Sequence, residues 1–528
     1  MRNFYLSERS TVYSTNCAVA TSHPLSTSTA INIIKQGGNA IDAAISASAV
    51  LSVVEPTEAG LGGDCVALVA PKGETPPIAF NGCGFSPLKD KLEWFIENDY
   101  REIPSDSPHS VTIPGALDAW IKLHEKFGKL DFEELLQPAI NYAENGFVIH
   151  DRVYQSWEFA YKRLENDSIA KKIFLPNGKI PKIGDKFFNI PLANTFKKIC
   201  KNGWAEFYCG ETSEKIVKYL NQLGGFHTLE DFSSYEGNFV DPISANYRDK
   251  KIYQMPPNTQ GIIALIMLKI LEKYNLSQYE MFNKTRIHLF IEAAKISYLI
   301  RDQYLGSDLN SDEIIDFINN PSFINNFLNK IDLNKTSEIN SILPLSNSNT
   351  VYLTIVDKDQ NCVSIINSIY ESFGSGICPP DTGILLQNRG KSFKINKMHP
   401  NCLGPRKRPM TTIMPGMVSK DNLVNLSFGV MGGDYQPIGH AHIISALYDN
   451  KMDLQKACDL PRFFWNSNTV FVEESFDINL FNQLEKLGHI VKYNDEPLGG
   501  AQLISIDWKK GILAAASDSR KDGCALGF

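Results

Sequence analysis

Thr350 stands where a short polar segment meets a run of strand-forming residues. Residues 346–349, SNSN, show no apolar periodicity, whereas residues 350–356, TVYLTIV, are of the β-branched and aromatic types that favour strands. A chain cut before Thr350 would carry a hydroxyl nucleophile and a free α-amino group on one residue. Because an α-amino group has a reference pKa of about 8, it suits a general base near neutral pH. The hydroxyl could also attack the carbonyl of Asn349 and make the cut itself, although an ordinary loop before an ordinary strand remains the alternative.

A β-hairpin is predicted to hold Thr350. A turn segment, DKDQN, and a second strand-like run at 362–370 follow the first strand. The position of Ser368 relative to Thr350 depends on the register. Pairing Lys358 with Asn361 puts the two hydroxyls on opposite faces, whereas a loop longer by one residue puts both on the same face. The sequence does not choose between these registers.

Two later segments carry groups that could assist such chemistry. Residues 426–434, LSFGVMGGD, are typical of an apolar strand that ends in Gly432 and Gly433. Bare backbone N–H groups of this kind can hold an oxyanion as a tetrahedral intermediate forms, although a Gly-Gly turn is also a common structural feature. Thr411 and Thr412 lie in a second segment, RPMTTIMP, where they could equally be turn residues.

Two helices and a glycine-rich turn are predicted near the N-terminus. Residues 26–36 have helical apolar spacing and end at a Gly-Gly stop, and Asn39 can cap a second helix that ends before Pro56. Residues 55–64, EPTEAGLGGD, could form a phosphate-cradling loop, but both the G-x-G-x-x-G pattern and a P-loop lysine are missing. Close backbone packing at these glycines is the better interpretation.

Together these motifs resemble the γ-glutamyltransferase family. The matching segments extend from about Cys17 to Phe528 and include the following: the His23-Pro24 pair, 55–64, 110–120, 135–147, 253–261, 292–295, 350–370, 373–376, 383–389, 408–415 and 426–434. The resemblance implies an N-terminal-nucleophile hydrolase of the α+β class, with a four-layer αββα fold, that cleaves itself before a threonine. It implies a large segment, 1–349, and a small segment, 350–528, that together form one αββα domain.

The resemblance also assigns roles to individual residues. Thr350 would be the nucleophile, Ser368 a hydroxyl that hydrogen-bonds it, and the bond between Asn349 and Thr350 the processing site. Gly432 and Gly433 would form the oxyanion hole. The predicted substrate-binding residues are Thr411 and Thr412, which would contact the bound acyl group, together with Tyr370 and Arg389.

The departures from the family pattern concern the substrate. Members that cleave glutathione hold the α-carboxylate with an arginine, but Cys83 stands at that position. They hold the α-amino group with an acidic residue in an N-N-x-M-D-D-F stretch. The matching stretch of this chain, residues 387–393, has the sequence QNRGKSF and contains no acidic residue. Arg389 would repel an ammonium group, and a guanidinium prefers a carboxylate. This form resembles the branch that includes oxamate amidohydrolase and glutathione-hydrolase-like proteins, and we expect Arg389 to receive a carboxylate of a small amide.

The composition of the chain argues against several classes of binding partner and cofactor. A net charge of −7 without a basic stripe argues against nucleic acid and against anionic membranes. The 10 cysteines form no C-x-x-C pair, which suits the reduced thiols of a cytoplasmic enzyme better than a disulfide frame. No signal peptide is recognisable, which again favours the cytoplasm. The histidines show no H-E-x-x-H or Cys/His metal spacing, so neither a metal nor another cofactor is predicted.

The sequence therefore predicts a self-cleaving amide hydrolase or acyltransferase that acts on a γ-glutamyl or similar small amide. An oxamate-type amidohydrolase for a small carboxylate-bearing amide is one alternative. A binding module that has kept the fold and lost catalysis is another. The expected partners are the small-molecule substrate and the two segments of the same proenzyme, with a dimer of these as a further option.

Overall fold

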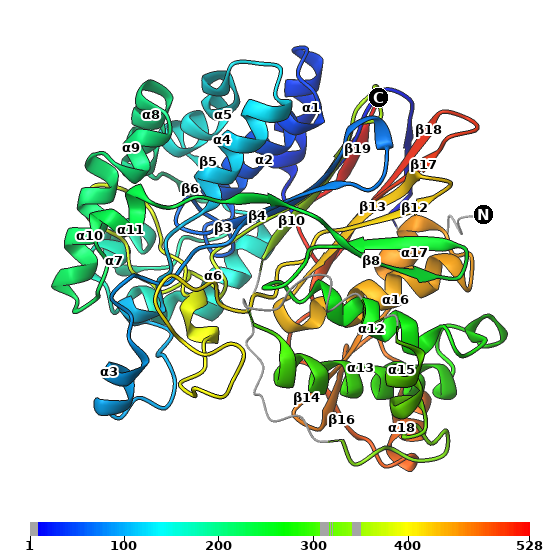
Figure 1. Ribbon diagram of the computed structural model, residues 1–528. Coiled ribbons are helices and arrows are strands. Elements are labelled where there is room, and N and C mark those ends of the chain that lie inside the picture. The colour runs from blue at the N-terminus through cyan, green and yellow to red at the C-terminus, as the bar shows by residue number, and fades with distance from the viewer. Residues whose placement is uncertain (1–8, 307–315, 317, 319, 340–349) are drawn as a thin grey trace.

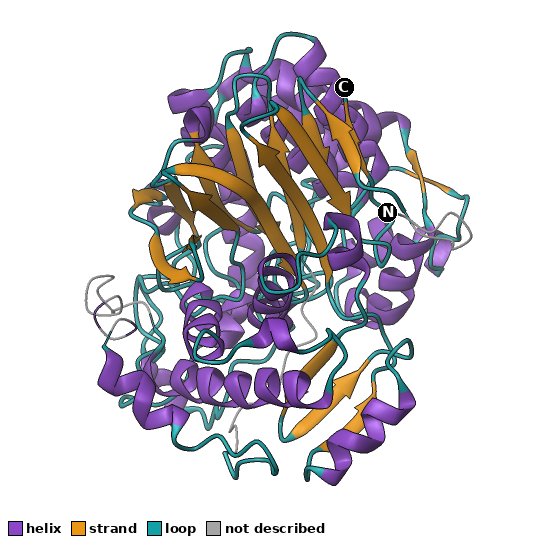
Figure 2. Cartoon of the chain, turned by 90° about the vertical axis from the view of Figure 1, so that its right-hand side faces the viewer, coloured by secondary structure: helices purple, strands orange, loops and turns teal. Residues whose placement is uncertain are grey.

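The structure is a computed structural model of the 528-residue chain, and it describes residues 9–306, 316, 318, 320–339 and 350–528. Two seven-stranded antiparallel sheets lie face to face, and helices cover the outer face of each (Figures 1 and 2). This arrangement confirms the predicted α+β fold with four αββα layers. None of the helices in the described part of the chain is long and apolar enough to cross a membrane.

The first sheet holds the predicted hairpin at its centre. Its order is β19 (Ala525–Gly527), β2 (Ala18–Ala20), β10 (Val351–Val356), β11 (Cys362–Ser368), β3 (Asp64–Ala70), β4 (Ile78–Gly82) and β7 (Asn238–Val240). The second sheet has the order β1 (Val12–Ser14), β18 (Ile512–Ser517), β17 (Gly500–Asp507), β13 (Leu423–Met431), β12 (Gly416–Lys420), β9 (Lys250–Gln254) and β8 (Ile243–Tyr247). Both sheets combine strands from 1–349 with strands from 350–528. The division into two segments itself stays a prediction.

Helices form the two outer layers. On the first sheet lie α1 (Pro24–Lys35), α2 (Ala40–Val54), α4 (Ala116–Phe127), α5 (Phe132–Asn145) and, beyond them, α6 (Asp151–Leu164) and α8 (Ile190–Asn202). On the second lie α12 (Gly261–Leu271), α13 (Lys284–Tyr304), α16 (Gln436–Tyr448) and α17 (Leu454–Asp459). Smaller elements complete the chain: α3 (Leu92–Glu97), α7 (Ser168–Phe174), α9 (Trp204–Tyr208), α10 (Glu211–Gln222), α11 (Leu229–Ser233), α15 (Pro321–Leu328), α18 (Ile478–Lys486), and strands β5 (Phe147–Val148), β6 (Lys186–Phe187), β14 (Phe463–Asn466), β15 (Thr469–Val472) and β16 (Ile490–Tyr493).

The alternation of side chains along β10 determines which face Thr350 occupies. Val351, Leu353 and Ile355 pack in the core beneath the helices of the first layer. Tyr352 and Val356 pack in the separate core between the two sheets. Because successive side chains of a strand point to opposite faces, Thr350 lies on the inner side, between the sheets.

The predicted N-terminal elements are present. Helix α2 begins after Asn39, whose side chain accepts from Ile41 N at 2.9 Å and from Asp42 N at 3.0 Å, and every residue of the helix is buried. The glycine-rich turn packs closely, as expected. A Cβ added at Gly62 would lie 2.1 Å from Leu385 O, so only glycine fits there.

His440 on α16 contributes a pH-dependent part of the stability. Its Nε2 accepts from Val430 N at 3.2 Å, and burial lowers its pKa to about 3. The unfolded chain has the higher pKa, about 6.5, so it takes up the proton first as the pH falls. The stability that neutral His440 supplies is therefore complete above pH about 6.5 and is lost progressively below it.

We expect His440→Gln to cost more free energy of unfolding at pH 8 than at pH 5, with a difference of about 2 kcal/mol. The reason is that wild type must bury a neutral histidine at pH 5, whereas glutamine does not titrate. Urea unfolding of both proteins at the two pH values measures this. An equal cost at both would show that His440 does not contribute through its titration.

Candidate active site

Thr350 and Ser368 face each other at the open end of the hairpin. Val356 pairs with Cys362, which leaves a five-residue loop, and the same register brings Thr350 opposite Ser368. Their hydroxyl oxygens are 3.3 Å apart, and Thr350 is 1% exposed. Of the two registers considered from sequence, the structure has the one with the longer loop, so both hydroxyls lie on one face.

Asp357 explains why the loop is the longer one. Its Oδ1 accepts from the backbone N–H groups of Asp359 and Asn361, both at 3.0 Å, which closes the loop. Its Oδ2 accepts from Ala40 N, at the start of α2, at 2.9 Å. A carboxylate at a helix N-terminus is favourable, so the hairpin loop and the buried helix stabilise each other.

Contacts between the sheets align Thr350 with the glycine pair. Thr354 Oγ1 lies 2.7 Å from Ser427 Oγ. Two residues earlier, the ring of Tyr352 covers Gly429, where an added Cβ would lie 2.5 Å from a ring atom. Side chains on one face of a strand recur every second residue, so the next pair in this series is Thr350 and Met431. Thr350 therefore lies over Met431, directly before Gly432.

The turn at Gly432 and Gly433 presents backbone N–H groups at this end of the sandwich. Gly432 has φ 115° and Gly433 has φ 55°, a left-handed backbone that other residues rarely adopt. In the described part of the chain, no turn or loop hydrogen bond uses either N–H group. These two N–H groups could therefore donate to a negatively charged oxygen, as an oxyanion hole requires.

Gln260 and Arg301 hold this turn in place. Gln260 Nε2 donates to Gly433 O and to Thr412 O, both at 3.0 Å. Arg301 donates to Gln260 Oε1 at 3.1 Å and to the carboxylate of Asp434. Both residues are buried, so the turn and Thr412 form one rigid unit with α12 and α13. Sequence reasoning missed this pair, because each is distant in sequence from the glycines.

Arg389 is fully buried and has partners within the protein. Its Nε donates to Asp64 Oδ2 at 2.7 Å, Nη1 donates to Thr411 Oγ1, and Nη2 donates to Ser368 O at 3.2 Å. The guanidinium also lies 5.2 Å from the centre of the Tyr370 ring. The expectation that Arg389 receives a substrate carboxylate stays a prediction, but this geometry favours a positioning role, because Asp64 already supplies its counter-charge.

The remaining predicted residues lie around the same end of the sheets. Tyr370, at φ 79°, donates from its N–H to Ser368 Oγ at 3.0 Å. The Thr412 hydroxyl is buried and has no hydrogen-bond partner within the described residues. Asn349 lies outside the described residues. The structure therefore brings together Thr350, Ser368, Tyr370, Arg389, Thr411, Thr412, Gly432 and Gly433, while their individual roles stay predictions.

The family model described as gamma-glutamyltranspeptidase matches residues 26–528. The chain belongs to the γ-glutamyltranspeptidase family. It is thus an enzyme of the self-processing amide hydrolase and acyltransferase type.

Two curated relatives and one solved structure illustrate the similarity. The glutathione hydrolase-like YwrD proenzyme of Bacillus subtilis is 33% identical over 98% of this chain and 99% of its own. The oxamate amidohydrolase proenzyme of Klebsiella pneumoniae is 28% identical over 98% of this chain and 99% of its own. A cephalosporin acylase structure from Bacillus halodurans is 33% identical, with a TM-score of 0.92 over 100% of this chain and 98% of that one.

Cys83 supplies no charge where glutathione-cleaving members of the family have an arginine. The side chain is fully buried, and burial raises the pKa of its thiol to about 12. The thiol is therefore neutral at physiological pH. The expectation that this positive clamp is missing stays a prediction.

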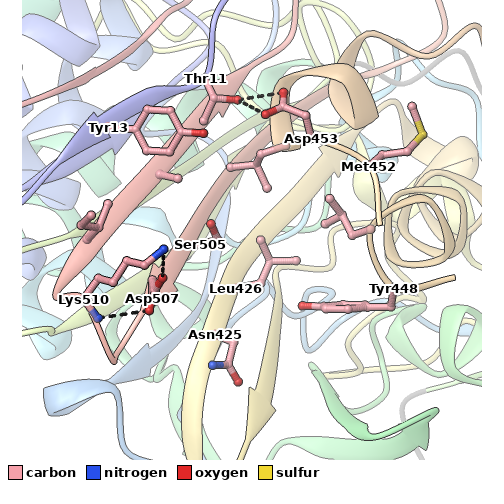
Figure 3. Close-up of a pocket in the computed structure, with 14 residues that line it drawn as sticks. Thr11, Tyr13, Asn425, Leu426, Tyr448, Met452, Asp453, Ser505, Asp507 and Lys510 are labelled. Atoms are coloured by element: carbon pink, nitrogen blue, oxygen red, sulfur yellow. Dashed lines mark hydrogen bonds and ion pairs between the residues drawn. The ribbon is translucent and has the colours of Figure 1, made fainter. Parts of the chain in front are cut away.

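A pocket far from this end of the sheets contains none of the predicted site residues. It lies on the outer face of the second sheet and is lined by residues that include Thr11, Tyr13, Leu426, Tyr448 and Lys510 (Figure 3). Leu426 is six positions before Gly432 along β13, so the pocket is near the opposite end of that strand. It has no part in the arrangement around Thr350.

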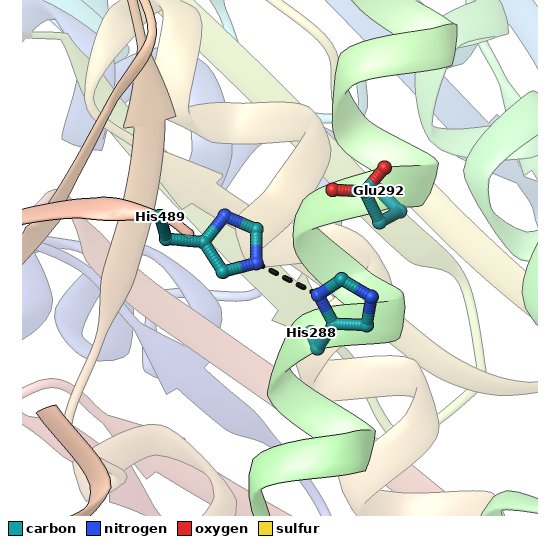
Figure 4. Close-up of side chains that lie close together, drawn as sticks. All are labelled: His288, Glu292 and His489. Atoms are coloured by element: carbon teal, nitrogen blue, oxygen red, sulfur yellow. Dashed lines mark hydrogen bonds between the residues drawn. The ribbon is translucent and has the colours of Figure 1, made fainter. Parts of the chain in front are cut away.

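One buried group in the described part of the chain has the ligand types of a metal site. His288 and Glu292 on α13 face His489, which precedes β16 (Figure 4). His288 Nδ1 and His489 Nε2 are 2.7 Å apart and hydrogen-bonded, and the Lys295 ammonium donates to Glu292 at 2.8 Å. These contacts form a hydrogen-bond network without any ion. The prediction that the protein uses no metal stays a prediction.

This network anchors the chain upstream of the predicted processing site. His288 contacts Asp332 O at 2.8 Å, and Glu292 accepts from Ser337 N at 3.2 Å. Lys295 and Glu292 also bind the hydroxyl of Thr336. Residues 332–337 are therefore tied to α13 twelve or more positions before Thr350.

We expect Gln260→Ala to lower kcat for amide hydrolysis by about 10- to 100-fold with little change in KM, because a displaced oxyanion donor acts in the transition state. The measurement is steady-state kinetics on a substrate that wild type accepts. Gln254→Ala is the matched control, since Gln254 is also a fully buried glutamine but contacts His440 on the far side of the second sheet. Equal kinetic losses in both variants would contradict a positioning role for Gln260.

We expect Arg389→Ala to lower the free energy of unfolding by about 3–5 kcal/mol, because it leaves the Asp64 carboxylate buried without a counter-charge. The double variant Arg389→Ala/Asp64→Asn removes that charge and should recover at least about 1 kcal/mol. Urea unfolding of the three proteins measures both effects. A double variant no more stable than Arg389→Ala would show that the ion pair is not the cause.

Proposed function

We propose that the chain cuts itself before Thr350 and then uses Thr350 as the N-terminal nucleophile of an amide hydrolase. The single observation that carries the proposal is the position of Thr350: it faces Ser368 at 3.3 Å and lies over the end of β13, directly before Gly432. A threonine on a buried strand, beside free N–H donors, has the nucleophile, the base and the oxyanion stabiliser within one site.

In the proposed reaction, the α-amino group of Thr350 takes the proton from its own hydroxyl as the oxygen attacks the amide carbon. The N–H groups of Gly432 and Gly433 hold the negative charge that develops on the carbonyl oxygen. The ammonium then returns the proton to the leaving amine as the C–N bond breaks, which leaves an ester on Thr350. Water attacks this ester with the same amine as base, and the acid is released. Another amine in place of water would give acyl transfer.

The substrate of the proposal is a small amide, of γ-glutamyl type or similar. The buried, internally paired Arg389 and the neutral Cys83 leave neither family clamp for an α-amino acid head group. An amide with a carboxylate and no ammonium is therefore the second candidate, and the similarity to an oxamate amidohydrolase and a cephalosporin acylase supports it. The set of Thr350, Gly432 and Gly433 argues against a module without catalysis.

A cytoplasmic location, with a part in glutathione metabolism, completes the proposal. All 10 cysteines are free thiols, which suits a reducing compartment. The relation to glutathione is supported by the likeness to a glutathione hydrolase-like proenzyme. A dimer of the processed protein is also part of the proposal.

The intact mass of the purified protein tests the cut. Wild type should give two polypeptides on denaturation, one of 349 residues and one with the remaining 179 of the 528. Thr350→Ala lacks the nucleophile and should give one chain, whereas Ser368→Ala should still cut, more slowly. A single full-length chain in wild type that persists for days would contradict the mechanism.

A further inference from the structure

Lys521 lies between the two sheets at the end where Thr350 lies. Gly500 opens β17 and pairs with Met431, whose side chain packs in the core between the sheets. A Cβ added at Gly500 would lie 2.8 Å from Lys521 Cγ and 3.1 Å from Met431 Cε. Because paired residues of a sheet share a face, the Lys521 stem crosses the inner face of the sheet one residue before the Gly432 turn.

The ammonium of Lys521 has no hydrogen-bond or ion-pair partner among residues 9–306, 316, 318, 320–339 and 350–528, although the residue is only 5% exposed. The arginine before it differs, because Arg520 binds the carboxylates of Asp518 and Glu473. Burying a charged group without a partner is costly. Lys521 is therefore an unused cation at the predicted active site.

None of the charged side chains around Lys521 forms an ion pair with its ammonium among the described residues. Four charged side chains act electrostatically on the Lys521 ammonium: Glu58, Arg152, Glu55 and Asp518. Arg152 is a second cation beside Glu58, and Asp518 is already bound by two arginines. Ser22 donates to Glu55, and burial raises the pKa of that carboxyl to about 7, so it is partly neutral at physiological pH. Glu58 is the carboxyl that acts most strongly on Lys521, and burial raises the pKa of both Glu58 and Glu55, which favours their neutral forms. An anion that enters beside Lys521 would meet Lys521 and Arg152 together with these two carboxyls.

We propose that Lys521 binds a carboxylate on the acyl group of the substrate, so that the enzyme cleaves amides whose acyl part carries a carboxylate and no ammonium. The inference rests on the proposed function, whose site it completes. Arg389 is paired with Asp64, and Cys83 is neutral, whereas Lys521 has no ion-pair partner among the described residues and can receive a substrate carboxylate. A carboxylate would also offset the burial that lowers the pKa of Lys521.

Two p-nitroanilides of equal size test the proposal. Glutaryl-p-nitroanilide is the γ-glutamyl compound without its ammonium, and 4-carbamoylbutyryl-p-nitroanilide replaces its carboxylate by a neutral amide. We expect Lys521→Met to raise KM for the glutaryl compound by about 10- to 100-fold and to leave the carbamoyl compound unchanged, because a hydrogen bond to a charged group is lost only with the first. Lys521→Arg should stay close to wild type on both.

Lys510→Met is the control, since Lys510 lies at the opposite end of the sheet in the pocket of Figure 3. Self-cleavage and thermal unfolding of each variant show whether it has folded. Equal losses on both substrates, or no loss on either, would overturn the role of Lys521.

Calorimetric binding of glutarate separates this inference from the proposed function. If wild type cuts neither anilide, the proposed hydrolysis fails, but glutarate can still be titrated into wild type, Lys521→Met and Lys510→Met. Binding to wild type and Lys510→Met that is at least tenfold weaker in Lys521→Met would support the anion site without catalysis. Equal binding in all three proteins, or binding in none, would overturn it.

Discussion

The contact between Tyr352 and Gly429 is the constraint on which the site depends. The two sheets approach so closely there that any side chain at position 429 would collide with the ring. With the bond between Thr354 and Ser427, this contact fixes β10 against β13 in one alignment. Because both strands are stiff and fully hydrogen-bonded, the alignment extends to their ends, where it brings Thr350 next to Gly432.

Buried polar contacts then hold the two sides of the site independently. On the side of Thr350, Asp357 joins the hairpin loop to the first turn of α2. On the glycine side, Gln260 and Arg301 join the turn to α12 and α13. Each group is satisfied inside the protein, so neither side needs a substrate to become ordered. The groups that we propose to be catalytic are thus positioned before a substrate binds, as electrostatic stabilisation of a transition state requires.

Local patterns predicted the local structure well and the long-range pairs poorly. Asn39 and the Gly-Gly stop predicted the boundaries of the first two helices, and the turn residues after Val356 predicted the hairpin. The register was open because it depends on Asp357 and on α2, more than 300 positions away. The pairing of Arg389 with Asp64 was not foreseen, because Asp64 lies 325 positions earlier in the chain. Gln260 and Lys521 were missed for the same reason, since no motif marks them.

The long-range pairs determine which buried cations have a counter-ion within the protein. A fully buried guanidinium must keep a counter-ion, and the pair of Arg389 with Asp64 stabilises the end of β11 by binding Ser368 O. A residue paired in this way is suited to hold the end of β11, and its contact with a substrate stays a prediction. The cation that we propose for the substrate carboxylate, Lys521, lies in the last turn before β19, apart from the hairpin that holds Thr350. In this proposal, the nucleophile and the cation for the substrate come from different segments of the chain, so one can change while the alignment of β10 with β13 is kept.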